Sequence, residues 1–455
     1  MPNFLKNLRE KHDLKTLIFY SSWSLTLTSG LSYVLGYLRD AVLTSKFGLT
    51  GNLDIYKASF VLPEMLQNIL IVAALSAGFV PIFSKNYDQK KEAGALYAHQ
   101  ILSWGTMLLL GSIILAIIFM PHIAPFFVEG FTGEKMEQYI SLTRFLLITT
   151  FIFGISTILG QILISLKEFF WYGLSPVLNN LGVIFGIFYL LPSFGLMGLI
   201  LGAMIGSLLH LIIRYIVVKR KKIKFQLMPN FGLSKEIKET FLLAYPKIPQ
   251  YILAQIMTAK FVSISTKFPE GTTTAHDLAK NLQSMPVSFL GIAISFAMFT
   301  SLSHDAGKGN FDKFKKDFKK NRFKALFYTT FAAGFMAIFS TFIVQTLFGR
   351  GDFGAESVSL LAGILMIYCI SIPLESLLHI YHRAFYALKN TLIPSTIHSL
   401  TIILTIIGAY LLSDTIGIYC IPVSFASGLA LHIIVLSTVF PILLKKREAS
   451  AELSV

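Results

Sequence analysis

Charged residues are scarce in this sequence. Aspartate, glutamate, lysine and arginine together make up 14% of its 455 residues, whereas a soluble globular domain carries about 25%. Apolar residues make up 54%, and the mean hydropathy is +0.66. This composition argues against a soluble protein and indicates one that resides in a membrane.

Cysteine is also nearly absent, and the sequence lacks the motifs of enzymes and metal sites. Cys369 and Cys420 both lie in apolar segments, where they are expected to be small buried side chains rather than a disulfide or a metal pair. No glycine-rich phosphate loop, HExxH motif or cluster of metal ligands occurs. We therefore predict no enzymatic activity, no cofactor and no metal.

What the sequence does contain is a series of apolar runs. Each has roughly 20 residues, enough to cross about 30 Å of hydrocarbon, whereas a β-barrel would show short alternating segments. We predict an all-α integral membrane protein with about twelve transmembrane helices. The predicted spans are 15–38, 54–84, 97–120, 139–165, 173–191, 195–218, 240–266, 276–303, 323–348, 357–387, 391–412 and 416–444.

The basic residues lie mainly in loops between these spans. The KRKKIK cluster at 219–224 and the lysine-rich segment 308–324 fall on the same side as the N-terminus, and cytoplasmic loops carry an excess of lysine and arginine. The net charge of +15 is thus explained by topology and not by nucleic acid. We predict a multi-pass protein of the cytoplasmic (inner) membrane with both termini cytoplasmic. Residues 308–322 are either an amphipathic helix on the inner leaflet or a solvated connector.

The sequence divides into two halves of similar organisation. Six predicted spans precede the KRKKIK cluster and six follow it, which places the boundary between residues 1–225 and 226–455. The long second helix of each half has a proline near its first turns, Pro63 and Pro286. Corresponding interruptions are typical of transporters built from repeats, although proline is also common in membrane helices. We predict two six-helix lobes around a central cavity.

Ionisable side chains occur inside or at the ends of several spans, where they are costly and seldom face lipid. They are Arg39, Asp40, Asp54, Lys57 and Glu64 in the first half and Lys260 and Lys280 in the second. Cations that face a cavity would attract an anionic headgroup such as a pyrophosphate. The alternative is that they form structural ion pairs or extend from a span end to the interface.

Amide side chains accompany these charges and must also find partners within a membrane. Combining both groups, we predict that the substrate is bound by Arg39, Lys57, Lys260, Lys280, Gln67, Asn68, Asn281 and Asn180. The acidic residues Asp40, Asp54 and Glu64 are the candidates for coupling transport to an ion.

Several stretches together resemble one known family. SYVLGYLRDAVLTSKFG, DIYKASFVLPEMLQNIL, NLQSMPVSFLGIAISFAMFTSLS, LFGRGDF and RAFYALKNTLIPS are similar to signatures of the MurJ (MviN) lipid II flippases, which belong to the multidrug/oligosaccharidyl-lipid/polysaccharide exporter superfamily. The resemblance implies two lobes around a cationic cavity, alternating access and a polyprenyl-pyrophosphate-linked glycan as substrate. It also implies contact with membrane lipids and with cell-wall synthesis enzymes.

The sequence departs from this family at the cavity. Positions where the family carries cavity arginines are Tyr33, Gln67 and Asn281 here, and a family glutamate corresponds to Ser284. The twelve predicted spans are also two fewer than typical lipid II flippases have. Three alternatives therefore stand beside a lipid II flippase: a polysaccharide-repeat lipid flippase, a cation-coupled drug exporter of the same superfamily, and a transport-inactive scaffold.

Overall fold

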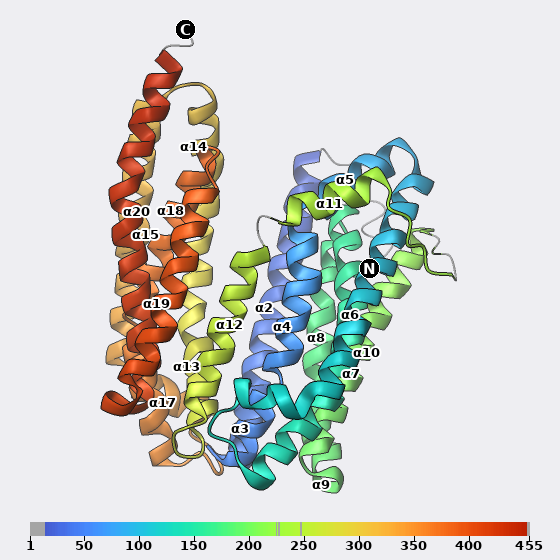
Figure 1. Ribbon diagram of the computed structural model, residues 1–455, viewed down its shortest axis with the longest axis vertical. Coiled ribbons are helices and arrows are strands. Elements are labelled where there is room, and N and C mark those ends of the chain that lie inside the picture. The colour runs from blue at the N-terminus through green and yellow to red at the C-terminus, as the bar shows by residue number, and fades with distance from the viewer. Residues whose placement is uncertain (1–13, 224, 226–227, 246–247, 453–455) are drawn as a thin grey trace. The chain divides into compact units, whose positions relative to one another are not determined.

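The described chain is built from helices alone. The structure is a computed structural model that describes residues 14–223, 225, 228–245 and 248–452, and every regular element among them is helical (Figure 1). Eight helical segments of these residues are long and apolar enough to cross a membrane, or nine if the bent pair Phe311–Ile338 and Ser340–Phe348 counts as one span. The predicted fold class is confirmed, and the count of twelve spans stays a prediction.

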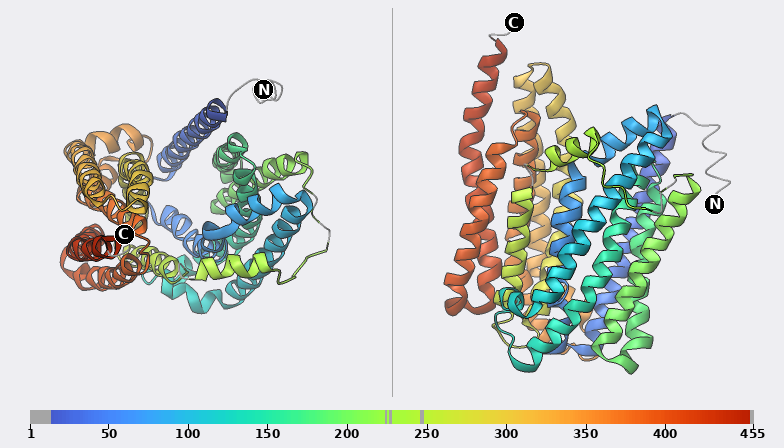
Figure 2. Two further views of the ribbon diagram at one scale, coloured as in Figure 1. Left: turned by 90° about the horizontal axis from the view of Figure 1, so that it is seen from above. Right: turned by 45° about the vertical axis from the view of Figure 1, so that its right-hand side comes forward.

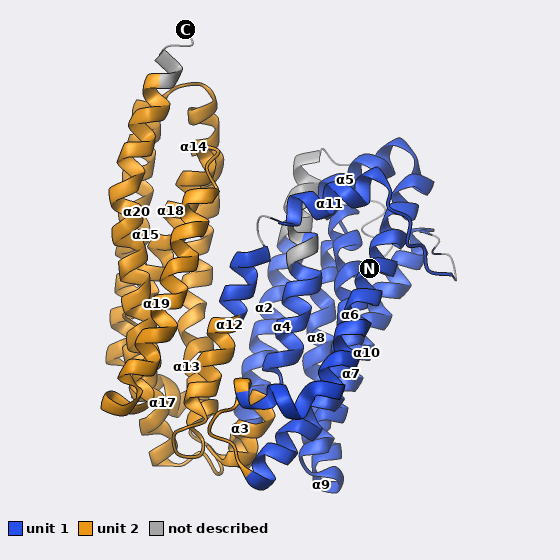
Figure 3. Cartoon of the chain, in the orientation of Figure 1, with its two compact units in different colours: residues 1–43, 59–125, 133–255 blue, residues 44–58, 126–132, 256–455 orange. Residues whose placement is uncertain are grey.

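The helices pack into two compact units, coloured separately in Figure 3. Unit 1 comprises residues 1–43, 59–125 and 133–255, and unit 2 comprises 44–58, 126–132 and 256–455. Two short segments of the N-terminal half, 44–58 and 126–132, thus belong to unit 2. The lobe boundary predicted after residue 225 stays a prediction.

Most of the first half of the chain belongs to unit 1. Its helices are α2 (Leu14–Phe47), α4 (Val61–Gln67), α5 (Ala73–Gln89), α6 (Lys91–Phe127), α7 (Gly133–Ser165), α8 (Phe169–Phe185), α9 (Leu191–Phe194), α10 (Leu196–Arg220) and α11 (Lys235–Ala244), with the ends of α2 and α6 reaching into unit 2.

Unit 2 contains the remaining helices. They are α3 (Gly51–Ala58), α12 (Ile248–Ser265, of which 256–265 lie in unit 2), α13 (Thr272–Pro286), α14 (Ala293–Gly307), α15 (Phe311–Ile338), α16 (Ser340–Phe348), α17 (Ala355–Tyr368), α18 (Ser371–Ala387), α19 (Leu392–Ile416) and α20 (Cys420–Glu452). The two red helices of Figures 1 and 2, α19 and α20, lie side by side.

Each half has an irregular turn in its second long helix, as the prolines predicted. Pro63 lies in the first turn of α4, where proline is tolerated because its missing N–H would be unpaired there. The π-helical turn Asn68–Val72 follows it. In the second half, the π-helical turn Val287–Ile292 comes directly after Pro286. π-helical turns inside α-helices are rare and are frequently found at functional sites.

Local backbone conformations also recur between the halves. Gly195, between α9 and α10, has φ 57° and ψ −144°, and Gly417, after α19, has φ 58° and ψ −141°. Lys167 and Lys389 each follow a long helix and have φ of 60° and 55°, a region that few lysines adopt. These paired conformations support the prediction that the two halves are repeats of one arrangement.

Glycines allow α8 and α10 to approach closely in unit 1. A Cβ atom built on Gly202 of α10 would lie 2.6 Å from the Cα of Gly186, and one built on Gly186 would lie 2.6 Å from the Cα of Gly202. Small residues spaced four apart are a common way for membrane helices to pack, because they bring the two backbones into contact. This contact was not anticipated from the sequence.

The basic segment 308–322 forms the start of a continuous helix. Residues from Phe311 onward belong to α15, which runs on to Ile338. One face is aromatic: the Phe318 ring lies 4.7 Å from that of Phe440 on α20. Lys315, three residues earlier and near the same face, has its Nζ 2.7 Å from the Glu448 carboxylate of α20. The segment therefore contacts α20 through both a ring and an ion pair.

We predict that Gly202→Ala destabilises the protein by about 1–3 kcal/mol, because the added methyl group overpacks the contact with α8. Thermal unfolding of the purified protein in detergent measures the change. Gly111→Ala is the matched control: Gly111 lies in α6, and a Cβ atom added there would have nothing within 4 Å, so alanine is expected to be neutral or slightly stabilising. Equal effects of the two substitutions would contradict the packing argument.

Candidate functional site

Asp54 is a helix-capping residue in unit 2. It lies on α3 and is 4% exposed. Its Oδ2 accepts a hydrogen bond from the Gly271 N–H at 2.7 Å, and its Oδ1 accepts from the backbone N–H and the hydroxyl of Thr274 at 2.8 and 2.7 Å. These donors belong to the first turn of α13, whose N–H groups and dipole favour a carboxylate. Both oxygens of the predicted ion-coupling residue are thus engaged in holding α3 to α13.

Lys57 lies one turn further along α3 and forms an ion pair. Its Nζ is 2.8 Å from Asp277 Oδ2, and the Asn281 Nδ2 donates to the same oxygen at 3.4 Å. Asp277 and Asn281 are four residues apart on α13, so they share one face of that helix. The structure thereby brings together two predicted substrate-binding residues, Lys57 and Asn281, through one carboxylate.

Lys260 belongs to a second charge cluster of unit 2. Its Nζ is 3.0 Å from Glu129 Oε1, and it lies 3.9 Å from the centre of the Phe126 ring. Lys267 Nζ is 2.7 Å from Glu129 Oε2, and the Tyr410 hydroxyl also donates to Glu129. Burial raises the pKa of the Glu129 carboxyl, but the hydrogen bonds from Lys267, Tyr410 and Lys260 outweigh it and lower the pKa to about 2.

Lys280 also forms an ion pair within unit 2. Its Nζ is 3.3 Å from Glu375 Oε2 on α18 and 2.7 Å from the side-chain oxygen of Gln283. Gln283 also donates from Nε2 to Glu375 at 2.9 Å, which closes a three-membered network. The Lys280 ammonium lies 4.1 Å from the centre of the Phe425 ring on α20, a cation–π contact.

Arg39, Asp40 and Asn180 come together in unit 1. The Nε and Nη2 atoms of Arg39 donate to Asp40 Oδ1 at 3.1 and 3.0 Å, and its Nη1 donates to Asn180 Oδ1 at 3.2 Å. Asn180 in turn donates to the Ser32 carbonyl at 3.1 Å. Asp40 and Asn180 are 5% and 7% exposed. The network joins α2 to α8.

The remaining predicted residues of unit 1 lie apart from this network. Gln67 Nε2 donates to the Thr157 hydroxyl of α7 at 3.0 Å. Asn68, at the π-helical turn, donates to the side-chain oxygen of Gln255 at 3.3 Å. Glu64 is exposed on α4. The two amides therefore have helix–helix partners, as buried amides in a membrane require.

The four predicted cations share one feature: each is paired with a carboxylate. The partners are Asp40 for Arg39, Asp277 for Lys57, Glu129 for Lys260 and Glu375 for Lys280. Glu129 was missed, because it lies in a short connection between two spans and carries no helical pattern. Each cation that could meet an anionic group is therefore already paired with a carboxylate in this structure.

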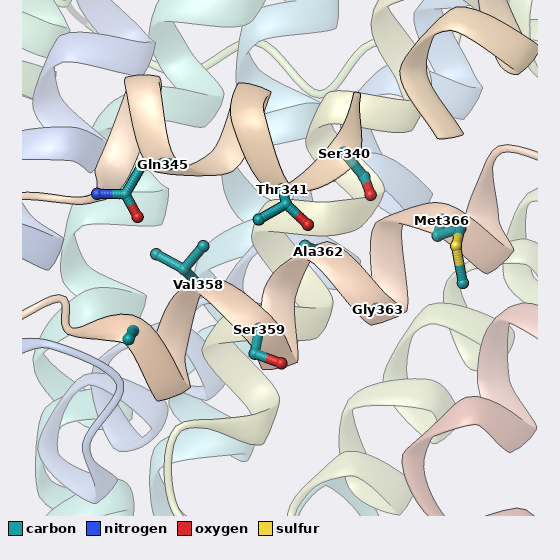
Figure 4. A pocket seen from close by; sticks show the side chains of 9 residues that line it. Ser340, Thr341, Gln345, Val358, Ser359, Ala362, Gly363 and Met366 are labelled. Carbon is teal, nitrogen blue, oxygen red and sulfur yellow. The ribbon is translucent and has the colours of Figure 1, made fainter. Parts of the chain in front are cut away.

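A pocket of about 390 Å³ lies elsewhere in unit 2, between α16 and α17. Figure 4 shows Ser340, Thr341 and Gln345 on α16 opposite Val358 and Ser359 on α17. None of the predicted substrate-binding residues lines it.

Comparisons with known proteins identify the family. A family model described as "Lipid II flippase MurJ" matches residues 43–452. A protein of Thermotoga maritima described as "Probable lipid II flippase MurJ" is 28% identical over 386 residues, which cover 84% of this chain and 75% of that protein.

Solved structures show the same fold. The structure titled "Lipid II flippase MurJ, inward closed conformation" superposes with a TM-score of 0.79 at 20% identity and covers 94% of this chain and 90% of its own. An inward-facing multidrug resistance MATE family transporter of the MOP superfamily gives a TM-score of 0.75 at 16% identity, with coverages of 92% and 95%.

We predict that Asp54→Ala lowers the stability of the protein by about 1–3 kcal/mol, since it leaves buried N–H groups of α13 without an acceptor. Thermal unfolding in detergent measures the loss. Asp88→Ala serves as the control, because Asp88 is exposed at the end of α5. If Asp54→Ala proved as stable as the control, the capping role would be wrong.

The Glu129 cluster predicts a specific pH dependence. Its carboxyl has a pKa of about 2 in the folded protein against an ordinary value of 4.5. The resulting stabilisation is fully present above the ordinary value and is lost as the pH falls toward 2. The melting-temperature difference between wild type and Glu129→Gln should therefore be largest at neutral pH and shrink below pH 4.5.

Exposed Glu137 on α7 provides the matched control. Glu137→Gln is expected to melt with the wild type at each pH. A Glu129→Gln difference that stayed constant from neutral to acidic pH would contradict the ion-pair argument.

Proposed function

Because the chain belongs to the lipid II flippase MurJ family, we propose that it moves lipid II, the undecaprenyl-pyrophosphate-linked peptidoglycan precursor, across the cytoplasmic membrane. The direction is from the inner to the outer leaflet, by alternating access, with both termini in the cytoplasm. The observation that carries the proposal is the family match over residues 43–452, which includes parts of both halves.

In this proposal Arg39 within unit 1 and Lys280 within unit 2 are the favoured phosphate contacts, each considered within its own unit. The planar guanidinium of Arg39 suits two phosphate oxygens at once, and 28% of its side chain is exposed. Of the three predicted lysines, Lys280 is the most accessible, with 34% of its side chain exposed against 12% for Lys57 and 17% for Lys260. Exposure therefore favours Lys280 among the lysines.

Phosphate binding then works by exchange. A phosphate oxygen replaces Glu375 at Lys280 and Asp40 at Arg39, so the cations keep an anionic partner throughout. Each displaced carboxylate then lacks a positively charged partner. A coupling ion that binds there neutralises it. Asp40, a predicted ion-coupling residue, fits this scheme because Arg39, with which it pairs, is a phosphate contact. Asp54 fits it less well, since both of its oxygens serve the cap of α13.

A polysaccharide-repeat lipid flippase of the same superfamily would use the same phosphate contacts, because it shares the polyprenyl-pyrophosphate part of the substrate. The headgroup sugar distinguishes the two substrates. Replacement of an essential lipid II flippase in a living cell is therefore the decisive test.

We expect the chain to restore growth to a bacterial strain depleted of its own lipid II flippase. Arg39→Ala should abolish the rescue and weaken lipid II binding by the purified protein about 10- to 100-fold, since a charge-assisted hydrogen bond contributes about 1.5–3 kcal/mol. Arg39→Lys should retain part of the activity, because lysine keeps the positive charge but lacks the planar guanidinium that binds two phosphate oxygens at once.

Arg220→Ala is the control, since Arg220 is exposed at the end of α10, and it should rescue like the wild type. No rescue by correctly inserted wild type would overturn the assignment to lipid II. Rescue by Arg39→Ala would instead overturn the role of Arg39 alone.

A further inference from the structure

Three histidines from three helices meet inside unit 2, and the proposed function uses none of them. They are His382 on α18, His398 on α19 and His432 on α20. The ring centres of His398 and His432 are 5.1 Å apart, and that of His382 lies 5.3 Å from His432 and 5.8 Å from His398. We call this group the histidine triad.

Two members of the triad are joined by a hydrogen bond. The Nδ1 atoms of His398 and His432 are 3.3 Å apart, so one of them carries a hydrogen and donates it to the lone pair of the other. The two rings are thereby held in opposite tautomers. One ring keeps a lone pair on its Nε2 atom, and the other carries its hydrogen there.

The outer nitrogens of the triad lack partners. Among the residues that the structure describes, the Nε2 atoms of His382 and His432 are both buried and have no hydrogen-bond partner of ordinary geometry. His432 is 1% exposed, and the Pro394 backbone interacts with its ring. Buried polar atoms are nearly always paired, so two orphaned nitrogens in one cluster call for an explanation. A histidine that served only to join helices would be expected to use its nitrogens in that contact.

The ligand that fits is a proton rather than a metal. Within the described residues, no group of three histidine, cysteine, aspartate or glutamate side chains has the geometry to hold a metal ion. Imidazole is the side chain that gains and loses a proton near neutral pH. Protonation at a bare Nε2 also turns the Nδ1–H···Nδ1 contact into a stronger, charge-assisted hydrogen bond.

We propose that the histidine triad is a proton-binding site and that lipid II binding drives proton uptake there. This inference rests on the proposed function and extends it by naming the coupling ion. One proton from solvent adds to an imidazole nitrogen and converts the triad from neutral to singly positive. No other bond forms or breaks.

The coupling follows from the charges that surround the triad. Burial is the largest influence on His398 and His382 and disfavours a positive charge on either ring, as do His379 and Arg383 on α18. Glu375 is the neighbour that favours a positive charge on His398. The Arg383 guanidinium lies 3.8 Å from the centre of the Phe296 ring. Its positive charge opposes an imidazolium in the triad.

Two further groups come from helices packed against α18. They are Lys280 of α13, which pairs with Glu375, and Arg322 of α15, which donates to the Tyr381 hydroxyl at 3.2 Å. When a phosphate pairs with Lys280 in place of Glu375, the negative charge of Glu375 is no longer neutralised. That negative charge favours an imidazolium in the triad, so the proton is taken up as the substrate binds.

The test measures protons taken up when lipid II is added to the full-length protein in detergent. Calorimetric titration in two buffers of different ionisation enthalpy, at pH values around neutrality, gives the number per lipid II bound. The wild type should take up protons, and His398→Gln and His432→Gln should bind lipid II without doing so. His122→Gln, on an exposed position of α6, should behave like the wild type.

Glu375→Gln is a second test in case the histidine variants fail to fold. It leaves the triad intact and removes the carboxylate charge through which Lys280 influences the triad. It too should abolish proton uptake. Binding by the wild type without proton uptake, or uptake that persists in the triad variants, would overturn the inference while leaving the proposed function standing. Zinc retained by the wild type but not by His432→Gln would overturn it in favour of a metal site. Absence of lipid II binding by the wild type would overturn the proposed function itself.

Discussion

The cost of placing charge in a membrane constrains this structure more than any other single effect. An ionised side chain away from water must be paired and hydrogen-bonded, or it is strongly destabilising. The four predicted cations meet this requirement in the same way, each with a carboxylate within 3.3 Å. A cationic site of this kind does not present standing positive charge. In the proposed mechanism a phosphate replaces the carboxylate, so that the cation keeps an anionic partner.

The carboxylates are not equivalent, and their surroundings separate two roles. Asp54 is almost fully buried, and its oxygens accept from a helix N-terminus that does not change partners unless α13 moves. Glu375 shares its charge between a lysine and an amide, and that lysine is a third exposed. The first kind of carboxylate holds two elements together. The second kind can lose its partner to a ligand, which is what coupling to an ion requires.

The sequence predicted the parts of this molecule that depend on local pattern. Helix length and fold class follow from hydropathy, which acts over a few residues, and Pro63 and Pro286 indicated the helix of each half that is interrupted. Pairs such as Lys260 with Glu129 do not, because the partners lie on different elements and no periodicity relates them. Resemblance to a family supplied the positions of Arg39 and Asp40, but not their contact with Asn180 on α8. The three histidines of the triad lie on three different helices, and only the packing of α18, α19 and α20 brings them together.

Backbone and side-chain chemistry have diverged to different degrees between the two halves of the chain. The turns at Gly195 and Gly417, and at Lys167 and Lys389, keep nearly the same backbone angles. The polar groups do not correspond: Lys57, Lys260 and Lys280 pair with carboxylates in unit 2, which also holds the histidine triad, whereas the Arg39 network lies in unit 1. A repeated backbone lets both halves pack and flex alike, since helix packing depends on shape. Unequal chemistry means that, in the proposed mechanism, the cation of each unit gives up a different carboxylate, Asp40 at Arg39 and Glu375 at Lys280.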